Sequence, residues 1–398
     1  DVNTSSDLML RGKLLVKLGE DTKVVLAGDY ARTWGSIGIA YRPVPTSQLV
    51  IPSSVRPGGS FGYDDYVAMG GGFYDSISDF QPHIDTKMFG GYVRIEHDMG
   101  DVALKSITAY RGSDGFQRVE VDATPAKIID APLHNSEKQW TQEFQLSYTS
   151  DKLQGLIGLF YMDARSAYDP FQIIGLAITG ATGGAANGIR TESTQYTKSY
   201  AIFGQFTYAL GENTNLTVGG RYTVDKRKLK AQDALYLAAT FPLSSVTPTG
   251  HFIPTAAPFY LPPYPVRKDT FKEPTWRLAL DHKLSDDVMV YASYSRGFKS
   301  GVFNLVTPLD PAALPETLDA IEVGVKTDLL DKRLRFNLAG YYYKYKNIQA
   351  FQVNGVNTTL SNAASARIWG LDLDVQAVRG AGFTLTGSAA LLDHKYGS

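Results

Sequence analysis

The chain has 398 residues and a formal net charge of -1, with acidic and basic residues mixed along its length. That balance offers no basic stripe for nucleic acid, and the absence of cysteine excludes disulfide frameworks, thiolate metal sites and cysteine nucleophiles. No run of about 18 apolar residues could form a membrane-spanning helix. The mean hydropathy of -0.16 says little, because each strand of a membrane barrel alternates polar with apolar residues.

Alternating strands are predicted from the start of the chain onward. In residues 8–18, Leu, Gly and Val on one face alternate with Arg and Lys on the other, which indicates a strand. A polar turn at 19–22 leads into a second strand over about 24–30, and a long connection over roughly 35–85 follows. The same order of short turn and long connection then repeats. Further strands are predicted near residues 89–97, 102–111, 140–148, 156–163, 196–210, 216–226, 276–284, 288–296, 322–329, 334–345, 369–376 and 383–391.

The two faces of these strands differ most clearly between residues 316 and 391. Side chains of a strand alternate between its faces, so a period of two separates a dry face from a wet one. The residues expected to face lipid are Ile321, Val323, Val325, Leu334, Phe336, Leu338, Trp369, Leu371 and Leu373. The residues expected to face the lumen are Glu322, Lys326, Arg335, Asn337, Asp372 and Asp374.

About 14 strands follow from these patterns, and every second connection between them is short. Many of these segments have a length near the ten residues that a tilted strand needs to cross a bilayer. Strict alternation of short and long connections is typical of outer-membrane barrels. We therefore predict an all-β, transmembrane antiparallel β-barrel with short periplasmic turns and long extracellular loops. A membrane-interface girdle is the expected role of Tyr341, Tyr342, Tyr343 and Tyr345.

Four segments, in this order along the chain, resemble the TonB-dependent outer-membrane receptors of Gram-negative bacteria. They are residues 139–146 (QWTQEFQL), 290–304 (VYASYSRGFKSGVFN), 322–326 (EVGVK) and 341–349 (YYYKYKNIQ). The resemblance implies a receptor of about 22 strands whose lumen holds an N-terminal plug that is energised through the TonB complex. No segment before the first predicted strand resembles a plug or a TonB box. The expectation is that residues 1–398 form one barrel domain, about 14 of about 22 strands, without the plug and the C-terminal strands.

Exposed aromatic side chains on long connections are candidates for binding a partly apolar solute, because a flat ring offers a large contact area with few torsions. Two such clusters lie within residues 58–75 and 251–264, and residues 250–264 are expected to contain no strand. The alternative is that these rings pack on one another and stabilise the loops. The candidate substrate-binding residues are Tyr63, Tyr66, Tyr74, Phe252, Tyr260 and Tyr264.

Catalytic and metal-binding motifs are not found in the sequence. The six histidines show no metal-ligand spacing, and Ser300 lacks the context of a nucleophile elbow. The glycine-rich residues 180–188 have no P-loop lysine and are expected to form a flexible loop tip. We therefore expect no cofactor, no metal site and no enzyme.

Import of a scarce large solute is the function that the resemblance implies, with a ferric siderophore first and cobalamin or an oligosaccharide as alternatives. The expected partners are outer-membrane lipid, the TonB complex and an iron chelate or other large solute. Two other classes stay open. A passive porin-like channel would need a constriction loop, and a barrel enzyme such as a phospholipase would need a Ser/His pair on its outer wall.

Overall fold

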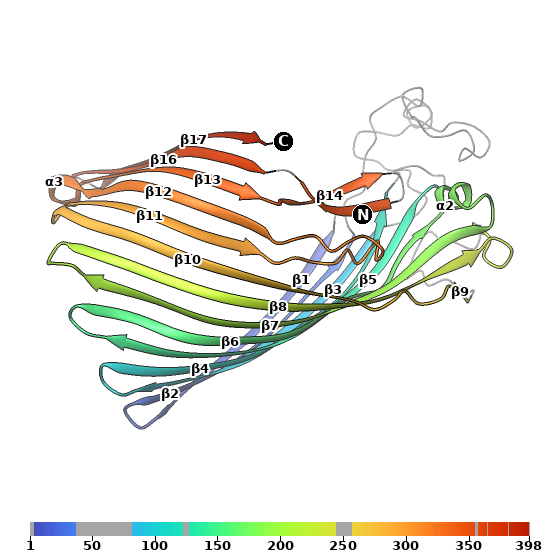
Figure 1. Ribbon diagram of the computed structural model, residues 1–398, viewed down its shortest axis with the longest axis horizontal. Coiled ribbons are helices and arrows are strands. Elements are labelled where there is room, and N and C mark those ends of the chain that lie inside the picture. The colour runs from blue at the N-terminus through green and yellow to red at the C-terminus, as the bar shows by residue number, and fades with distance from the viewer. Residues whose placement is uncertain are drawn as a thin grey trace.

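The protein is described by a computed structural model over residues 4–36, 82–121, 127–243, 257–354, 357–363, 365–380 and 382–397. Fourteen strands form one continuous antiparallel sheet (Figure 1), in which each strand pairs with the next along the path. The strands of this path are β1 (Ser5–Leu18), β2 (Thr22–Gly35), β3 (His83–Asp98), β4 (Val102–Glu120), β5 (Asp130–Thr149), β6 (Leu153–Ile174), β7 (Ala186–Ala209), β8 (Thr214–Leu237), β10 (Arg267–Ser285), β11 (Val288–Lys299), β12 (Glu316–Asp328), β13 (Leu334–Lys346), β16 (Ala366–Arg379) and β17 (Phe383–Tyr396).

Small elements occupy some of the connections. The two-residue strand β9 (Phe259–Tyr260) pairs with β8, and β14 (Gln349–Asn354) pairs with β15 (Asn357–Asn362) in a separate hairpin. The short helices are α2 (Leu176–Ala181), between β6 and β7, and α3 (Leu329–Lys332), between β12 and β13. In the described part of the chain, the helices are too short to cross a membrane.

Short and long connections alternate, as the sequence predicts. The turns that follow β1, β3, β5, β7, β10, β12 and β16 lie together at one end of the sheet, on the left of Figure 1. The longer connections, such as residues 300–315 between β11 and β12, leave from the opposite end. We call these the short-turn end and the long-loop end.

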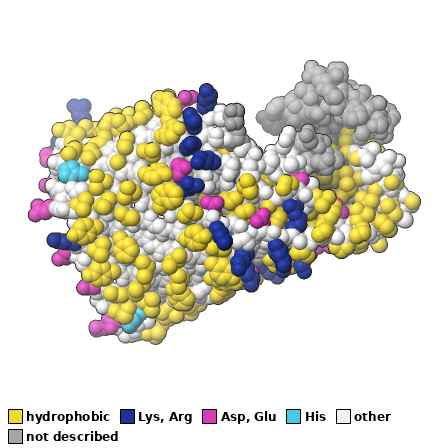
Figure 2. All heavy atoms as spheres, in the orientation of Figure 1, with side chains coloured by type: hydrophobic (Ala, Val, Ile, Leu, Met, Phe, Trp, Pro, Cys, Tyr) yellow, Lys and Arg dark blue, Asp and Glu magenta, His cyan; other side chains and the backbone are white. Residues whose placement is uncertain are grey.

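The register confirms the two predicted faces between residues 316 and 391. Val323 pairs with Gly340, which pairs with Leu371, whereas Glu322 pairs with Tyr341 on the other face. The predicted lipid-facing residues Ile321, Val323 and Leu371 are 50%, 54% and 44% exposed, so they are not enclosed in a core. Figure 2 shows hydrophobic side chains spread over the outside of the sheet at the short-turn end. We call this face the outer face and the opposite, polar face the inner face.

The tyrosine cluster on β13 corrects the girdle prediction. Because neighbouring residues of a strand point to opposite faces, only Tyr342 shares the outer face with Ile321 and Trp369. Tyr341 and Tyr343 stack on the inner face, with ring centroids 4.7 Å apart. Outer-face aromatic residues come from several neighbouring strands, among them Tyr200, Tyr222, Trp276, Tyr294 and Tyr342.

Candidate functional site

The inner face at the membrane level carries paired polar and charged groups. The Arg111 guanidinium contacts the Asp29 carboxylate at 2.8 Å, and the Tyr291 hydroxyl donates to Glu322 Oε1 at 2.7 Å. Arg221 lies over the Phe203 ring, 5.4 Å from its centroid. Charged side chains on this face satisfy one another without lipid contact, which is the arrangement of a polar barrel lumen.

A stripe of polar side chains continues this face toward the long-loop end. Five alternate residues of β7 form it, and each is buried: Thr191, Ser193, Gln195, Thr197 and Ser199. The sequence contains a signal for this stripe, because small polar residues recur with a period of two over residues 191–199. A prediction of strands from apolar alternation does not detect that signal, so the stripe is absent from the predicted site.

The connection over residues 300–315 packs against this stripe. The Phe303 backbone N–H donates to Gln195 Oε1 at 3.1 Å, and the Ser193 hydroxyl donates to the Leu305 carbonyl at 2.7 Å. Gly301 lies so close to the ring of Phe271 that a Cβ atom would collide with it. Since β7 is separated from β11 by two strands, this connection reaches back over the inner wall. We call residues 300–315 the inner loop.

The inner loop is also fixed from its other side. The Arg267 guanidinium donates to the Pro308 carbonyl at 2.9 Å and lies 5.1 Å from the centroid of the Phe303 ring. The Asn304 side chain donates to the carbonyl of Thr358 in β15 at 2.7 Å. The inner loop therefore joins the β7 wall to the β14–β15 hairpin.

Several buried polar atoms on the inner face have no hydrogen-bond partner among the described residues. They include Asp225 Oδ1, Arg227 Nε, Asp233 Oδ1 and Ser300 Oγ. Asp225, Arg227 and Asp233 occupy alternate positions of β8, beside the polar stripe of β7. A buried polar group without a partner costs roughly 1–3 kcal/mol, so an arrangement of this kind suits a wall that another polar group contacts.

The predicted substrate-binding aromatics fall into two groups. Tyr63, Tyr66, Tyr74 and Phe252 lie outside the described residues. Tyr260 and Tyr264 are described, and their hydroxyl groups donate to two different carboxylates. Tyr260 donates to Glu192 Oε1 at 2.9 Å, and Tyr264 donates to Asp233 Oδ2 at 2.7 Å. Glu192 pairs with Gln232, the residue next to Asp233, so the two carboxylates lie on opposite faces of the sheet.

The segment that carries these tyrosines is tied to β8 by its backbone. Tyr260 in β9 pairs with Ala234 in β8, and the Tyr264 N–H donates to the Ala231 carbonyl at 3.0 Å. The expectation that residues 250–264 contain no strand is therefore wrong. Burial raises the pKa of Tyr264 to about 12, and the hydrogen bond and charge of Asp233 act in the same direction. Tyr264 is thus an anchor of its segment.

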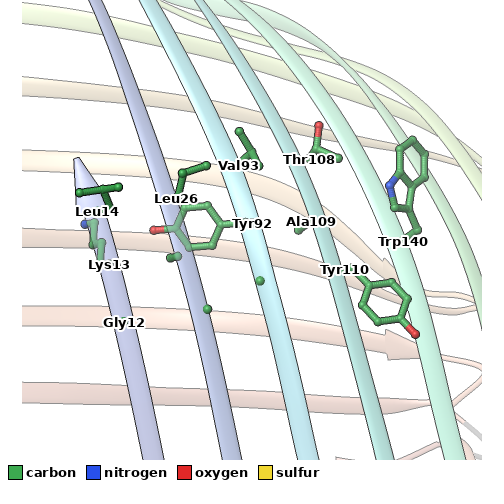
Figure 3. A pocket seen from close by; sticks show the side chains of 13 residues that line it. Gly12, Lys13, Leu14, Leu26, Tyr92, Val93, Thr108, Ala109, Tyr110 and Trp140 are labelled. Atoms are coloured by element: carbon green, nitrogen blue, oxygen red, sulfur yellow. The ribbon is translucent and has the colours of Figure 1, made fainter. Parts of the chain in front are cut away.

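A shallow groove of about 810 Å³ lies on β1 to β5 (Figure 3). Its floor is formed by Gly12, Gly28 and Gly91, which pair across three strands. Leu14, Leu26, Val93, Tyr110 and Trp140 border the groove. These apolar side chains belong to the outer face, so the groove faces lipid and is no part of a path through the lumen.

Within the described ranges, no group of three or more His, Cys, Asp or Glu side chains is arranged to hold a metal ion. A sheet with a dry outer face, an aromatic girdle and a polar inner face is the wall of an outer-membrane β-barrel. Residues 18–397 match the family described as "TonB dependent receptor-like, beta-barrel". The chain belongs to this family, whose members are outer-membrane transport proteins of Gram-negative bacteria and not enzymes.

Solved structures of the same architecture include three transport proteins. The ferric yersiniabactin uptake receptor FyuA of Yersinia pestis is 15% identical, with a TM-score of 0.74 over 100% of this chain and 53% of its own. The alcaligin receptor FauA of Bordetella pertussis is 15% identical, with a TM-score of 0.57 over 98% and 54%. The copper transporter OprC is 13% identical, with a TM-score of 0.63 over 98% and 54%. The chain thus spans about half the length of these structures, and the likeness concerns the fold.

Proposed function

We propose that this barrel wall belongs to a receptor that imports a scarce large solute across the outer membrane with energy from the TonB complex, and that the solute is a ferric siderophore. The observation that carries the proposal is the inner face at the long-loop end, where buried polar atoms of Asp225, Arg227 and Asp233 have no partner among the described residues. A polar chelate or a plug would supply such partners. Two of the structural neighbours are siderophore receptors by name, which favours this substrate class over cobalamin or an oligosaccharide.

Residues 1–398 act in this proposal as one barrel domain around a plug. Solute capture belongs to the long-loop end, and Tyr260 is its candidate contact because its ring is 46% exposed. Tyr63, Tyr66, Tyr74 and Phe252 stay candidates because they belong to aromatic-rich connections of the sequence. Tyr264, whose hydroxyl is held by Asp233, holds the segment in place.

Uptake by cells tests the proposal. The full-length gene product is expressed in a Gram-negative strain that lacks its own siderophore receptors, and uptake of radioactive iron is measured with a panel of siderophores. We expect uptake with at least one siderophore, and loss of that uptake when the TonB gene is deleted. Uptake of labelled cobalamin or oligosaccharide alone would contradict the substrate class.

A matched pair of inner-face variants locates the binding region. Arg227→Gln changes the wall beside the polar stripe, whereas Arg277→Gln makes the same change on the inner face nearer the short turns. A hydrogen bond to a charged group contributes about 1.5–3 kcal/mol, so we expect roughly tenfold or more weaker siderophore binding for Arg227→Gln alone. Equal affinities of the two variants would remove this wall from the binding region.

A passive channel is the second candidate, and the inner loop favours it. A porin-like channel needs a loop folded onto its inner wall, and residues 300–315 pack against β7 in that way. Planar-bilayer recordings distinguish the two functions. A channel gives steady conductance in the full-length protein and uptake that does not need TonB, whereas a plugged receptor gives neither.

A further inference from the structure

The outer face carries a dense group of lysines just beyond the aromatic girdle on β7, β8 and β10. In Figure 2, Lys and Arg side chains form a band between the hydrophobic surface at the short-turn end and the long-loop end. Lys226 lies two residues beyond Val224, which pairs with the girdle residue Tyr200. The six lysines of this part of the band, here called the outer lysine cluster, are Lys198, Lys226, Lys228, Lys230, Lys268 and Lys272.

Register places like charges directly opposite one another in the outer lysine cluster. Lys198 pairs with Lys226, and Lys228 pairs with Lys268. Like charges on facing residues of neighbouring strands destabilise a sheet. Lys198 has an acidic partner, since its Nζ lies 3.4 Å from the Asp163 carboxylate. The other lysines of the cluster have no ion pair among the described residues.

The acidic residues of the same strands lie on the other face. Asp225 and Asp269 alternate with the lysines along β8 and β10, and each pairs with an inner-face residue. On other strands some cations of the band have acidic partners: Arg32 lies 2.8 Å from Asp85, and Arg296 lies 4.0 Å from Asp319. On β7, β8 and β10 the acidic side chains therefore leave most of the charge of the outer lysine cluster uncompensated on the outer face.

The lysine stems and ammonium groups lie against aromatic rings at the membrane boundary. Lys226 Nζ is 5.7 Å from the centroid of the Tyr200 ring, and Lys228 Nζ is 4.5 Å from that of Tyr196. Such contacts hold a cation at the level where lipid headgroups begin, with its alkyl stem on the apolar side. Lys226, Lys230, Lys268 and Lys272 are exposed.

We propose that the outer lysine cluster is a binding site for the phosphate groups of an anionic lipid in the outer leaflet. Unpaired lysines at headgroup depth provide the charge complementarity, and a headgroup with more than one phosphate could bridge the two strand pairs of like charge. The occupant is an inserted lipid rather than a soluble polyanion, because the cluster continues directly into the aromatic girdle and the apolar outer face. This inference needs the membrane orientation of the barrel and is independent of the proposed solute.

Native mass spectrometry of the full-length protein in detergent tests the proposal. The probe is lipid A, a glycolipid with two phosphate groups, and the variant is Lys226→Gln/Lys228→Gln/Lys268→Gln. Each lysine near an anionic lipid surface contributes roughly fivefold in affinity, so we expect about a hundredfold weaker binding of lipid A. The control, Lys23→Gln/Lys152→Gln/Lys283→Gln, makes the same change in net charge at exposed sites near the short turns, and its affinity should stay as in the parent protein.

Additional ligands show whether the bound phosphate belongs to an inserted lipid, and the unfolding temperature shows whether the variants are folded. Phosphatidylethanolamine and dephosphorylated lipid A should bind equally well to parent and variant, and soluble polyphosphate should not displace lipid A. Removal of facing like charges should leave the unfolding temperature unchanged or raise it, which separates lost binding from misfolding. Three results would each overturn the proposal: an equal loss of lipid A binding in the control variant, binding of dephosphorylated lipid A to the parent protein as tight as that of lipid A, or displacement of lipid A by polyphosphate.

Discussion

The two halves of β7 and β8 share a backbone ladder but are stabilised by different surroundings. Toward the short turns, outer-face residues such as Ile202 and Val218 are 61% and 51% exposed, and only lipid can cover them. Toward the long loops, the inner-face residues Ser193 and Leu229 are each 2% exposed and lie among other parts of the chain. The boundary between the halves is the level of the outer lysine cluster.

One strand can therefore lie in two environments, with lipid around its lower half and other parts of the protein around its upper half. The lower half depends on the hydrophobic thickness of the membrane, since its apolar face has no protein partner. The upper half depends on side-chain hydrogen bonds and ion pairs among neighbouring strands and the inner loop. Substitutions should therefore have different costs, and respond to different conditions, in the two halves.

The largest expected effect is the loss of a buried ion pair in the long-loop half. Arg118 is fully buried, and its Nη2 lies 2.8 Å from Asp130 Oδ2. Asp130→Ala removes this carboxylate from the buried Arg118 guanidinium, which should lower the free energy of unfolding by about 3–5 kcal/mol. Guanidinium unfolding of the full-length protein in phospholipid vesicles measures the loss. The double variant Arg118→Met/Asp130→Leu should recover most of it, and failure to recover would show that the charges themselves are needed.

A charged residue on the outer face of the lower half should have the next largest effect. Leu278 is 50% exposed on the outer face of β10, midway between Lys272 and the short turn. Leu278→Arg should lower the free energy of unfolding by about 2–4 kcal/mol, the cost of an arginine at the bilayer midplane. Guanidinium unfolding in vesicles measures this loss as well. Ala279→Arg places the charge on the neighbouring inner-face position and should cost about 0–1 kcal/mol, as a charge outside the lipid does. Similar costs for both would contradict the assignment of the two faces.

The contact between the inner loop and β7 should have a smaller, local effect. Gln195→Ala removes the acceptor of the buried Phe303 N–H, which costs about 1–3 kcal/mol. We expect faster hydrogen exchange and faster proteolysis within residues 300–315, while the barrel stays folded. Thr194→Ala, one residue away on the opposite face, is the control and should leave both rates unchanged. An unchanged exchange rate in the Gln195 variant would show that the inner loop is held by other contacts.

The lower half of the sheet could be predicted from the sequence because lipid imposes a pattern that repeats on every strand. Period-two alternation at Ile321, Val323 and Leu371 fixes both the strands and their faces, and the alternation of short and long connections gives their order. The upper half follows no such rule. The sequence predicted a strand over 216–226, but β8 continues to Leu237, since its upper residues are stabilised by distant parts of the chain.

The candidate site was less predictable for the same reason. The pairing of Tyr264 with Asp233, and of Gln195 with the backbone of Phe303, depends on contacts 31 and 108 residues apart along the chain. Aromatic content indicates that residues 251–264 could bind a solute, but it does not distinguish an anchoring ring from an exposed one. Only the three-dimensional arrangement assigns the first role to Tyr264.

The smallest effect, and the one most specific to the upper half, is the response of Tyr264 to pH. Burial and the Asp233 carboxylate raise its pKa from 10.0 to about 12, so the folded state favours the neutral hydroxyl. This contribution to stability is fully present below pH 10 and is lost as the pH rises through about 12. Tyrosinate absorbance follows the titration, and Tyr264→Phe should reduce the amount of tyrosinate that forms late, near pH 12, by one group. The variant should also flatten the fall in stability over this range, because Phe cannot ionise. An unchanged titration curve in Tyr264→Phe would show that the hydroxyl is not held by Asp233, and the segment around β9 would then be anchored by its backbone pairing with β8 alone.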